Sequence, residues 1–349
     1  NFKTVINVRP DREVTIEHGA IIVATGGREY LPDGYLYGKD PRVMTQLQFE
    51  EKYATGTLPS YKTIVMVQCV GSRNPQRTYC SRVCCTETVK NALRVKNEHP
   101  EAQVFILYRD MRTYGFREDW FREARDQGVN FIRHEDDEPP VLDEKDGKLV
   151  LTVRDPVLDR KVRIHPDLVT LAVATLPAAG TPEMAQMLKV PLNRNGFFLE
   201  AHSKLRPLDF STEGIFFCGL AHAPKFLEEC IYQAQGAVAR ACTLLSQDEL
   251  ETEAAVAVVD ELRCRACGRC EEGCDFKAPQ IKVWEDGRLH ARINPAMCKG
   301  CGKCSARCCS GAVTVKHFTG RQIEKMVEAA LEGWDDPTEP GGEVKQNGA

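Results

Sequence analysis

The sequence predicts an α/β chain built around a parallel β-sheet, followed by a small cysteine-rich domain. Three observations predict this fold class. A buried strand, a helix and a second buried strand follow one another between residues 63 and 107, which is the βαβ order that a parallel sheet requires. Two further apolar, β-branched runs, residues 20–27 and 168–175, stand on either side of that unit. After residue 260, a cysteine motif of eleven residues occurs twice.

Composition excludes several classes of protein. The 349 residues leave room for two or three domains, each with its own core. A net charge of −4 without a basic stripe excludes a nucleic-acid-binding protein, and no apolar run is long enough to cross a bilayer. Thirteen of the sixteen cysteines fall in two dense clusters, which indicates metal binding in a reducing compartment. We therefore expect a cytoplasmic protein.

The βαβ unit carries cysteines at the turn where a dinucleotide would bind. Its first strand is the run Ile64–Val67, its helix includes Val89 and Leu93, and its second strand is Val104–Leu107. A nucleotide-binding unit has G-x-G-x-x-G at this turn, so that a pyrophosphate can approach the helix N-terminus. Here the turn has the single glycine Gly71. It also contains four cysteines, which are Cys69, Cys80, Cys84 and Cys85.

Four thiolates match the ligand set of an iron–sulfur cluster or of a structural zinc ion. The adjacent pair Cys84 and Cys85 is unusual for zinc, whose sites commonly use C-x-x-C knuckles. A helix N-terminus lowers the pKa of a nearby thiol, which favours metal ligation. Two alternatives stay open. One is structural disulfides, and the other is a redox-active dithiol as in flavin disulfide reductases, which use a short C-x-x-C.

The first residues resemble part of a flavin-binding domain. Residues 3–7 and 13–16 alternate like a hairpin, and the run 20–27 ends in Gly26 and Gly27. This run is similar to the strand that ends beneath the cofactor in two-dinucleotide flavoproteins, where small residues permit close backbone approach. No first βαβ unit precedes it. We therefore expect either a longer polypeptide or a partner subunit that supplies the missing piece.

A second segment carries a stronger flavin signal. Residues 211–221 lead into a helix over 228–245, and they resemble the T-x-G-I-F-A-x-G-D segment of thioredoxin-reductase-like flavoproteins. There the glycine lies at the pyrophosphate, and the helix N-terminus faces the flavin ring. Leu220 stands where those proteins have the aspartate that binds ribityl hydroxyls. The alternative is an ordinary strand–helix junction. The candidate FAD contacts in this segment are Gly219, Leu220, Cys230 and Gln233.

Residues 264–274 and 298–308 both read C-x2-C-x2-C-x3-C, the run of bacterial ferredoxins, in which the fourth cysteine binds the other cluster. This spacing predicts two 4Fe–4S clusters. Asp275 and Cys309 replace the proline that usually follows each run, which leaves Cys309 as an extra thiol. The ligands of one cluster are Cys264, Cys267, Cys270 and Cys308, and those of the other are Cys298, Cys301, Cys304 and Cys274.

Together these residues resemble the A subunit of heterodisulfide reductase, an iron–sulfur flavoprotein. The matching segments are 69–73, 79–85, the residues around Gly219, the ferredoxin-type module and 317–322. The resemblance covers nearly the whole chain but only the later part of the family's sequence, without its N-terminal domain and inserted ferredoxin. It implies a 4Fe–4S cluster near the flavin, with the ligands Cys69, Cys80, Cys84 and Cys85.

The resemblance also implies a role for Lys90. In the family, a lysine five residues after the adjacent cysteine pair approaches flavin N5, and that position is Lys90 here. A cation at N5 favours the anionic reduced flavin. The alternative is an ordinary solvated helix lysine.

The expected fold is thus a thioredoxin-reductase-like two-dinucleotide flavoprotein, incomplete at its N-terminus, with a bacterial-type two-cluster ferredoxin domain. We expect five regions. They are residues 1–60, the first part of the FAD-binding domain; 61–164, an inserted Rossmann-like domain with the four-cysteine site; 165–253, the second part of the FAD-binding domain; 254–320, the ferredoxin domain; and 321–349, a helical and flexible tail.

The resemblance implies a component of a heterodisulfide-reductase-like complex, with FAD and three 4Fe–4S clusters, that performs electron bifurcation. A hydrogenase- or formate-dehydrogenase-type partner delivers an electron pair, which is divided between a high-potential acceptor and ferredoxin. Three alternatives stay open: a non-bifurcating relay of the quinone-interacting type, an NAD(P)H-dependent flavin oxidoreductase like the small subunit of glutamate synthase, and a wiring subunit without flavin. The missing glycine-rich turn argues against the NAD(P)H-dependent enzyme.

Overall fold

The structure is a computed structural model that describes residues 2–9, 12–249, 255–295 and 297–332. The chain forms two compact units, one ending at Leu245 and the other beginning at Ser246. Each unit has its own hydrophobic clusters, as expected for a chain of this length.

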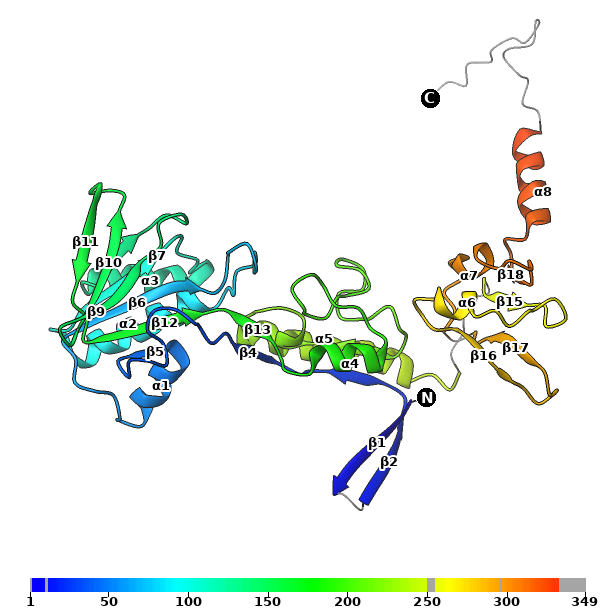
Figure 1. The fold of residues 1–349 in the computed structure, drawn as a ribbon, viewed down its shortest axis with the longest axis horizontal. Helices are drawn as coiled ribbons and strands as arrows, with labels where there is room; N and C mark the ends of the chain where they lie inside the picture. Colours follow the sequence, from blue (N-terminus) through cyan, green and yellow to red (C-terminus); the bar gives the residue numbers. More distant parts are fainter. Residues whose placement is uncertain (1, 10–11, 250–254, 296, 333–349) are drawn as a thin grey trace, which may run out of the picture. The chain divides into compact units, whose positions relative to one another are not determined.

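The first unit contains a five-stranded parallel sheet in the order β5–β12–β6–β7–β8 (Figure 1). Three helices pack on one face, and a three-stranded antiparallel sheet covers the other face. The strands of the parallel sheet are β5 (Val43–Thr45), β12 (Leu168–Val173), β6 (Thr63–Val70), β7 (Gln103–Tyr108) and β8 (Asn130–Arg133). The helices are α1 (Gln46–Ala54), α2 (Cys84–Glu98) and α3 (Glu118–Asp126). The antiparallel strands are β9 (Val141–Lys145), β10 (Lys148–Asp155) and β11 (Arg160–Ile164).

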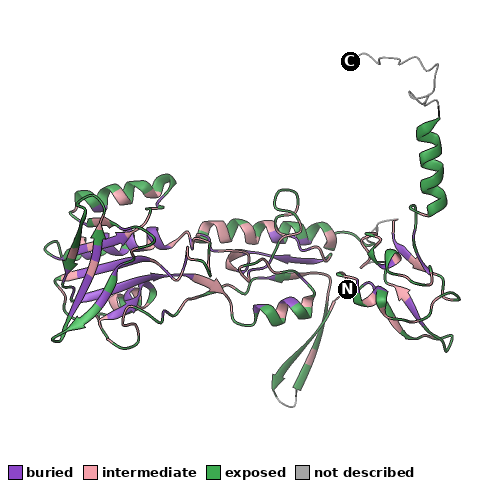
Figure 2. Ribbon diagram, turned by 45° about the horizontal axis from the view of Figure 1, so that its top comes forward, coloured by how far each residue is buried: buried purple, intermediate pink, exposed green. Residues whose placement is uncertain are grey.

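The sequence of the central strand β6 does not alternate between apolar and polar residues, because both faces of the strand are covered. Ile64 and Met66 pack against the helices, whereas Val65 and Val67 pack against the antiparallel sheet. A strand covered on both faces is apolar at successive positions. Figure 2 shows burial concentrated on the strands of this sheet. The βαβ unit predicted for residues 63–107 is confirmed.

A smaller half of the first unit is built from segments that flank this sheet in sequence. β3 (Ile21–Val23) pairs in parallel with β14 (Ile215–Phe217). The core around this pair contains three aromatic rings, Phe198, Phe210 and Phe217. The remaining elements of this half are the hairpin strands β1 (Phe2–Arg9) and β2 (Arg12–His18), the 3₁₀ turn η2 (Gly219–Ala221), α4 (Thr181–Leu188) and α5 (Leu227–Leu245). The hairpin and α5 agree with the sequence patterns.

Two short strands connect the two halves. β4 (Gly27–Glu29) leads out of the smaller half, and β13 (Thr175–Pro177) leads back into it. They pair antiparallel, with Leu176 opposite Arg28. The inserted sheet domain therefore leaves and returns at neighbouring points.

The predicted boundaries at residues 60/61 and 164/165 cut across the parallel sheet. β5, α1 and β12 belong with β6, because Val169 of β12 is in register with both Val43 of β5 and Val65 of β6. Most of the run 168–175 therefore lies outside the second part of the FAD-binding domain, where the predicted region 165–253 places it. The run is a strand of the inserted sheet, and β13 begins only at Thr175. Strand order depends on long-range pairing, which local composition does not show.

The second unit contains two antiparallel strand pairs and two short helices that follow the sequence repeat. Each short helix begins after a glycine in the left-handed conformation, Gly268 with φ 82° and Gly302 with φ 76°. The pairs are β15 (Ala257–Val259) with β18 (Val313–Val315), and β16 (Pro279–Val283) with β17 (Leu289–Ile293). The short helices are α6 (Arg269–Glu272) and α7 (Lys303–Ala306).

The predicted tail helix is α8 (Gly320–Leu331), and all its residues are exposed (Figure 2). The rest of the predicted tail, from residue 333, lies outside the described residues. Over the described parts of the chain, each helix is too short or too polar to cross a lipid bilayer.

A buried amide network ties α1 to α2 and β12. The Gln46 side chain donates to Thr88 Oγ1 and Thr170 Oγ1, each at 3.0 Å, and accepts from Asn91 at 2.8 Å. Gln46→Leu should lower the free energy of unfolding by about 2–3 kcal/mol, because it leaves buried polar partners without hydrogen bonds. Urea denaturation followed by circular dichroism measures this change. Gln103→Leu, at an exposed position of β7, is the matched control, and an equal loss in both variants would contradict the prediction.

Candidate functional site

The four cysteines of the βαβ unit come from three neighbouring segments at the carboxyl end of β6. Cys69 lies near the end of that strand, Cys84 and Cys85 are the first residues of α2, and Cys80 lies in the connecting loop. The carboxyl edge of a parallel sheet is where ligand sites form in α/β folds. The four predicted ligands therefore lie at the edge of the sheet where α/β proteins commonly bind ligands.

The loop between β6 and α2 adopts backbone conformations that most residues avoid. Cys69, Arg73 and Arg82 have φ angles of 61°, 55° and 64°. A Cβ atom on Gly71, whose φ is 78°, would lie 2.2 Å from the ring of Tyr30, so only glycine fits there. Such conformations persist only where the surroundings enforce them, and they cluster at functional sites.

The four thiols share one electrostatic environment. A hydrogen bond with Cys85, then burial and the charges of Cys69 and Cys80, raise the pKa of Cys84. Burial raises the pKa of Cys69, and the charge of Cys85 adds to the effect. A metal centre would replace the protons on such thiols, because the thiolate is the ligand.

Three arginines surround these thiols, and the sequence analysis did not select them as site residues. Arg109 and Arg73 oppose the rise that burial causes in the pKa of Cys69. A hydrogen bond with Cys84 lowers the pKa of Cys85, and Arg112 and Arg73 lower it further. Guanidinium groups therefore compensate the negative charge of a four-thiolate site. The sequence does contain a signal for these arginines. Arg109 and Arg112 closely follow β7, so they lie at the same edge of the sheet as the cysteines.

The four-thiol site is not arranged as a closed zinc site. In a tetrahedral zinc site with Zn–S bonds of ~2.3 Å, the sulfur atoms lie roughly 3.8 Å apart. Within the described ranges, the cysteines do not form a group of three whose sulfur atoms all lie within 4.8 Å of one another. Four thiolates as a donor set fit a 4Fe–4S cluster, and the cluster at this site stays a prediction.

In the second unit, one predicted quartet of cysteines surrounds a single cavity. Burial and then the charge of Cys298 raise the pKa of Cys304 to about 11, with a smaller contribution from Cys274 of the other motif. The N–H groups of Ala257 and Gly300 point to Cys298 Sγ at 3.3 and 3.5 Å. N–H groups in this arrangement stabilise cluster sulfur. The cavity lining includes Cys274, Cys298, Cys301 and Cys304.

The other quartet repeats this arrangement. Cys270 is buried, which raises the pKa of its thiol, and Cys264 and Cys267 raise it further. The N–H of Ala291 donates to Cys264 Sγ at 3.4 Å, as Ala257 does in the first quartet. Cys308, the remaining predicted ligand, packs in the same core.

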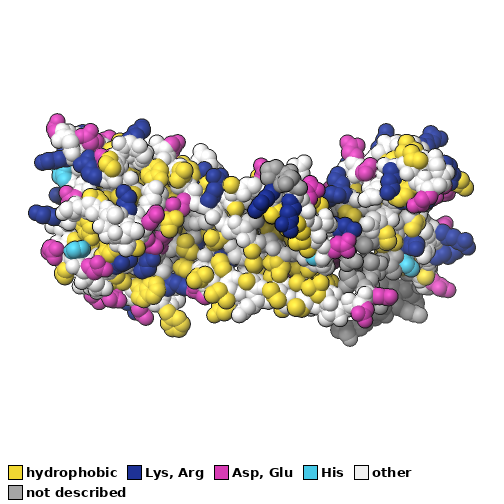
Figure 3. Space-filling view, turned by 90° about the horizontal axis from the view of Figure 1, so that it is seen from below, with side chains coloured by type: hydrophobic (Ala, Val, Ile, Leu, Met, Phe, Trp, Pro, Cys, Tyr) yellow, Lys and Arg dark blue, Asp and Glu magenta, His cyan; other side chains and the backbone are white. Residues whose placement is uncertain are grey.

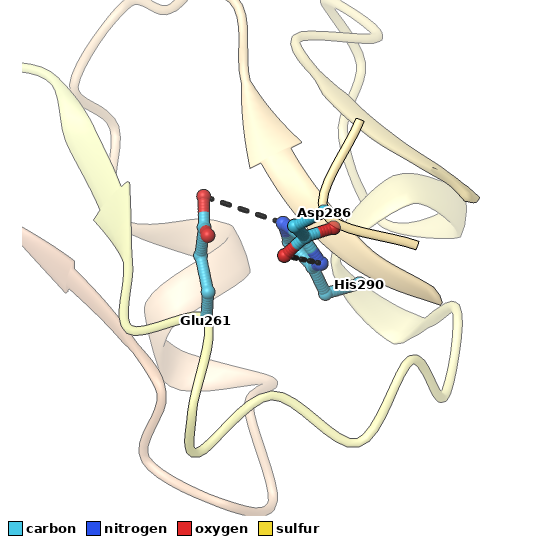
Figure 4. Close-up of side chains that lie close together, drawn as sticks. All are labelled: Glu261, Asp286 and His290. Atoms are coloured by element: carbon cyan, nitrogen blue, oxygen red, sulfur yellow. Dashed lines mark ion pairs between the residues drawn. The ribbon is translucent and has the colours of Figure 1, made fainter. Parts of the chain in front are cut away.

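Three further side chains of the second unit, His290, Glu261 and Asp286, lie close together (Figure 4). The His290 imidazole is buried, with Nε2 3.3 Å from Glu261 and Nδ1 3.8 Å from Asp286. Arg292 already pairs with Glu261 at 2.8 Å. Arg288 pairs with Asp286 at 3.0 Å. A metal ion would have to displace both guanidinium groups, so we interpret the group as an ion-pair network beside β17.

The predicted flavin residues meet where β14 ends and α5 begins. Gly219 has φ 69°, and its N–H donates to Gln233 Oε1 at 3.0 Å. A Cβ atom on Gly219 would lie 3.8 Å from Cys230 Sγ. A Cβ atom on Gly27 would lie 3.5 Å from the Cβ of Leu220, which places β4 against the same turn.

The two glycines at the start of β4 have different roles. A Cβ atom on Gly27 would lie 2.9 Å from the carbonyl oxygen of Leu176, so glycine is required there by the close pairing of β4 with β13. Gly26 has φ 74° and open space where its Cβ would be. The positive end of the α5 dipole lies nearby and favours an anionic group. The chemistry of this turn therefore fits a pyrophosphate such as that of FAD, and the predicted FAD contacts stay predictions.

Lys225 is a buried cation beside this group that the sequence analysis missed. It is 7% exposed, and its Nζ donates to the carbonyl oxygens of Gly219 at 2.8 Å and Ala223 at 3.1 Å. Burial lowers its pKa to about 8. One lysine in a loop gives no local signal of burial, since most lysines are exposed.

Lys90 lies on α2, and its side chain is 54% exposed. Its Nζ pairs with Glu50 Oε1 at 2.6 Å. Burial raises the pKa of the neighbouring Glu87 to about 7, and the charges of Glu50 and Glu29 act in the same direction. Glu29 belongs to β4, so this part of α2 lies near the connection to the smaller half. The role of Lys90 at a flavin stays a prediction.

Comparison with known proteins gives a consistent result. No family model matches the chain. The A subunit of the H(2):CoB-CoM heterodisulfide,ferredoxin reductase of Methanothermobacter thermautotrophicus is 38% identical over 339 residues, covering 91% of this chain and 50% of that protein. The A subunit of the ferredoxin:CoB-CoM heterodisulfide reductase of Methanosarcina acetivorans is 35% identical over 366 residues, covering 92% and 45%.

This chain belongs to the family of heterodisulfide reductase A subunits. A third relative, the A subunit of the H(2)/formate:CoB-CoM heterodisulfide,ferredoxin reductase of Methanococcus maripaludis, is 34% identical and covers 92% of this chain and 51% of that protein. The chain therefore spans about half the length of the curated relatives it matches. The resemblance that the cysteine motifs indicated is confirmed, and the names of these relatives agree with an oxidoreductase component.

Likeness to solved structures is weaker. Thioredoxin reductase of Lactococcus lactis aligns with 68% of this chain and 69% of its own, at 18% identity and a TM-score of 0.45. Thioredoxin reductase of T. acidophilum aligns with 66% of each chain, at 14% identity and a TM-score of 0.43.

Removing Cys274 should affect the cluster of the other motif. We expect Cys274→Ser to lose the iron of one 4Fe–4S cluster, because its thiol lies with Cys298, Cys301 and Cys304 around one cavity. Iron analysis and electron paramagnetic resonance (EPR) of the reduced protein measure the loss. Cys309→Ser is the control, since this exposed thiol is not a predicted ligand and should leave the iron content unchanged. Full iron content in Cys274→Ser would contradict the cross-motif ligation.

The buried Lys225 should give the first unit a pH-dependent stability. Its pKa is lowered to about 8, below the ordinary value of 10.5, so the folded state binds fewer protons than the unfolded state between these pH values. Unfolding free energy should therefore rise with pH there, by at most about 1.4 kcal/mol per pH unit. Urea titrations at several pH values should show this rise in the native protein and not in Lys225→Met. The exposed control Lys148→Met should keep it, and identical pH slopes in all three proteins would refute the effect.

Proposed function

We propose that this chain forms an iron–sulfur and flavin part of an electron-transferring subunit in a heterodisulfide-reductase-like complex, with FAD in the first unit and three 4Fe–4S clusters. One observation carries the proposal. The four-cysteine loop occupies the turn where a nicotinamide-using enzyme needs a phosphate cradle, and it touches the segment after β4 through Gly71 and Tyr30. This contact supports a proposed four-thiolate site close to the proposed FAD site.

The chain's own residues account for binding and electrostatics. Gly26, with open space where its Cβ would be, would leave the backbone accessible to the cofactor, while Lys225 and the α5 N-terminus would supply positive charge near it. Arg73, Arg109 and Arg112 compensate the charge of the four-cysteine site. When bound, FAD accepts an electron pair and exchanges single electrons with iron–sulfur clusters.

We propose FAD-based electron bifurcation as the activity of the complex. An electron pair from a hydrogenase- or formate-dehydrogenase-type partner is divided between a high-potential acceptor and ferredoxin. The names of two relatives support this assignment, because one joins hydrogen, heterodisulfide and ferredoxin, and another adds formate. Cluster-binding thiolates require a reducing setting, which is the cytoplasm.

Other subunits are proposed to cover the smaller half of the first unit, including one that completes the FAD domain. Its sheet has only the strands β3 and β14 among the described residues, and two strands are too few for independent stability. Figure 3 shows hydrophobic side chains gathered over the middle of one face. Large patches of this kind mark interaction surfaces. Exposed apolar residues of this half include Ile22, Met187, Leu227, Ile231 and Val238.

Three other functions are weighed against specific observations. A non-bifurcating, quinone-interacting relay needs the same cofactor sites. It differs from a bifurcating complex only in that acceptor reduction is not coupled to ferredoxin reduction. An NAD(P)H-dependent flavin oxidoreductase is disfavoured, because cysteines and arginines occupy the nucleotide turn. A wiring subunit without flavin is disfavoured by the open backbone at Gly26 beside the buried cation Lys225 and the α5 N-terminus, which together suit an anionic cofactor.

Activity of the native complex separates these functions. Hydrogen- or formate-driven reduction of ferredoxin should occur only while a disulfide acceptor is also reduced, with equal numbers of electrons passing to each. Cys84→Ala should lower this coupled reduction at least tenfold, because it removes a buried thiol of the four-cysteine site. Cys242→Ser, an exposed thiol on α5, is the control and should keep full activity. Acceptor reduction without ferredoxin dependence would establish the relay, and a complex without flavin would establish the wiring role.

A further inference from the structure

The segment Tyr79–Arg82, which carries the predicted ligand Cys80, contacts the smaller half of the first unit or its connecting strand β13 through each of its other three residues. Tyr79 donates its hydroxyl to the carbonyl oxygen of Thr175 at 2.8 Å, and its ring meets Phe197 edge-on with centroids 5.6 Å apart. Ser81 is 1% exposed, and its Oγ accepts the N–H of Thr175 at 2.9 Å. Both backbone groups of Thr175, where β13 begins, are therefore bound by residues that flank Cys80.

Arg82 makes the third connection. Its side chain donates to the carbonyl oxygen of Pro224 at 3.3 Å, and it pairs with Glu229 Oε1 and the hydroxyl of Tyr114, both at 2.7 Å. The second oxygen of Glu229 accepts the N–H of Phe226 at 2.7 Å, directly before α5. One guanidinium thus links the cysteine loop, the inserted domain and the start of α5.

Arg82 also acts directly on the cysteine. Its N–H points to Cys80 Sγ at 3.3 Å, and its φ of 64° is a conformation that a non-glycine residue adopts only under constraint. The side-chain contacts supply that constraint. Loss of these contacts would free the backbone at Arg82 and with it the direction of the Cys80 thiol.

We propose that Arg82, together with Ser81 and Tyr79, is a positioning residue that fixes Cys80 and its cluster at a set separation from the flavin turn. This inference rests on the proposed function. One electron leaves reduced flavin and is taken up by the oxidised 4Fe–4S cluster, and its transfer rate falls steeply with separation. Because the loop is bound to β13 and α5, the transfer needs no movement of the inserted domain. An unbound loop would instead make the transfer wait for domain closure.

The test compares the native complex with its Arg82→Lys variant, which keeps the positive charge but cannot reach three partners at once. Iron and flavin contents and both midpoint potentials should stay unchanged. The rate of electron transfer from photoreduced flavin to the cluster, followed by absorbance and EPR, should fall at least tenfold. The native rate should not depend on solvent viscosity, whereas the variant rate should decrease as viscosity rises. Arg94→Ala, which removes an exposed ion pair with Glu98 on α2, is the control and should behave as the native complex.

The outcomes are distinguishable. A native complex with no flavin, or with no iron bound by the four-cysteine loop, would refute the proposed function itself. A native rate that depends on viscosity, or an Arg82→Lys variant with native rate and viscosity response, would overturn the positioning role alone. If Arg82→Lys does not retain its cofactors, Tyr79→Phe gives the answer. It removes one hydrogen bond to Thr175 and keeps the ring contact, and it should slow transfer and introduce viscosity dependence.

Discussion

Bringing four thiols into one half-buried loop is the constraint on which the rest of the first unit depends. Burial disfavours the thiolate form, and each additional negative charge disfavours the others. The loop offsets both effects with guanidinium groups from the end of β7 and from the loop itself, and the backbone of Cys69 stays in a left-handed conformation that aims its thiol at the others. The parallel sheet supplies the rigid edge, because β6 is paired on both sides and covered on both faces. A nucleotide cradle at this turn would need small, uncharged residues instead.

The second unit also has to offset the negative charge of several thiolates held close together, and it does so differently. Its two cysteine quartets are surrounded mainly by backbone N–H groups, which the repeat places at equivalent positions, such as Ala257 facing Cys298 and Ala291 facing Cys264. Left-handed glycines before α6 and α7 make these close turns possible. Backbone donors compensate charge without adding net charge, whereas the arginines of the first unit add it. The two kinds of site therefore differ in the charge that surrounds their thiols.

Local patterns predicted many elements, including the β6–α2–β7 unit, the N-terminal hairpin, α5 and α8, because hydrophobic period and capping residues act over a few positions. Thr319 and Gln322 illustrate this, since their reciprocal capping bonds start α8. The boundaries predicted for the inserted domain leave out two strands of its sheet, β5 and β12. β12 is apolar in the same way as the strand of a flavin domain, and only its pairing with Val43 and Val65 assigns it to the inserted sheet. The site arginines and Lys225 were also missed, because a charged residue gives no local sign of what surrounds it.

The sequence by itself determined which thiols are available as ligands, and from their spacing it predicts the ligand chemistry. Cysteine is specified residue by residue, and the spacing of the ferredoxin-type motifs sets which thiols a short loop can bring together. The tertiary structure alone decided how the halves of the first unit are joined, which cations stand against the thiols, and how the segment around Cys80 is bound to Thr175 and Glu229. The reason is physical. Candidate metal ligands can be recognised from short motifs, whereas charge compensation and domain placement depend on side chains from separate segments that meet only after folding, such as Tyr79 with Thr175 and Arg82 with Glu229.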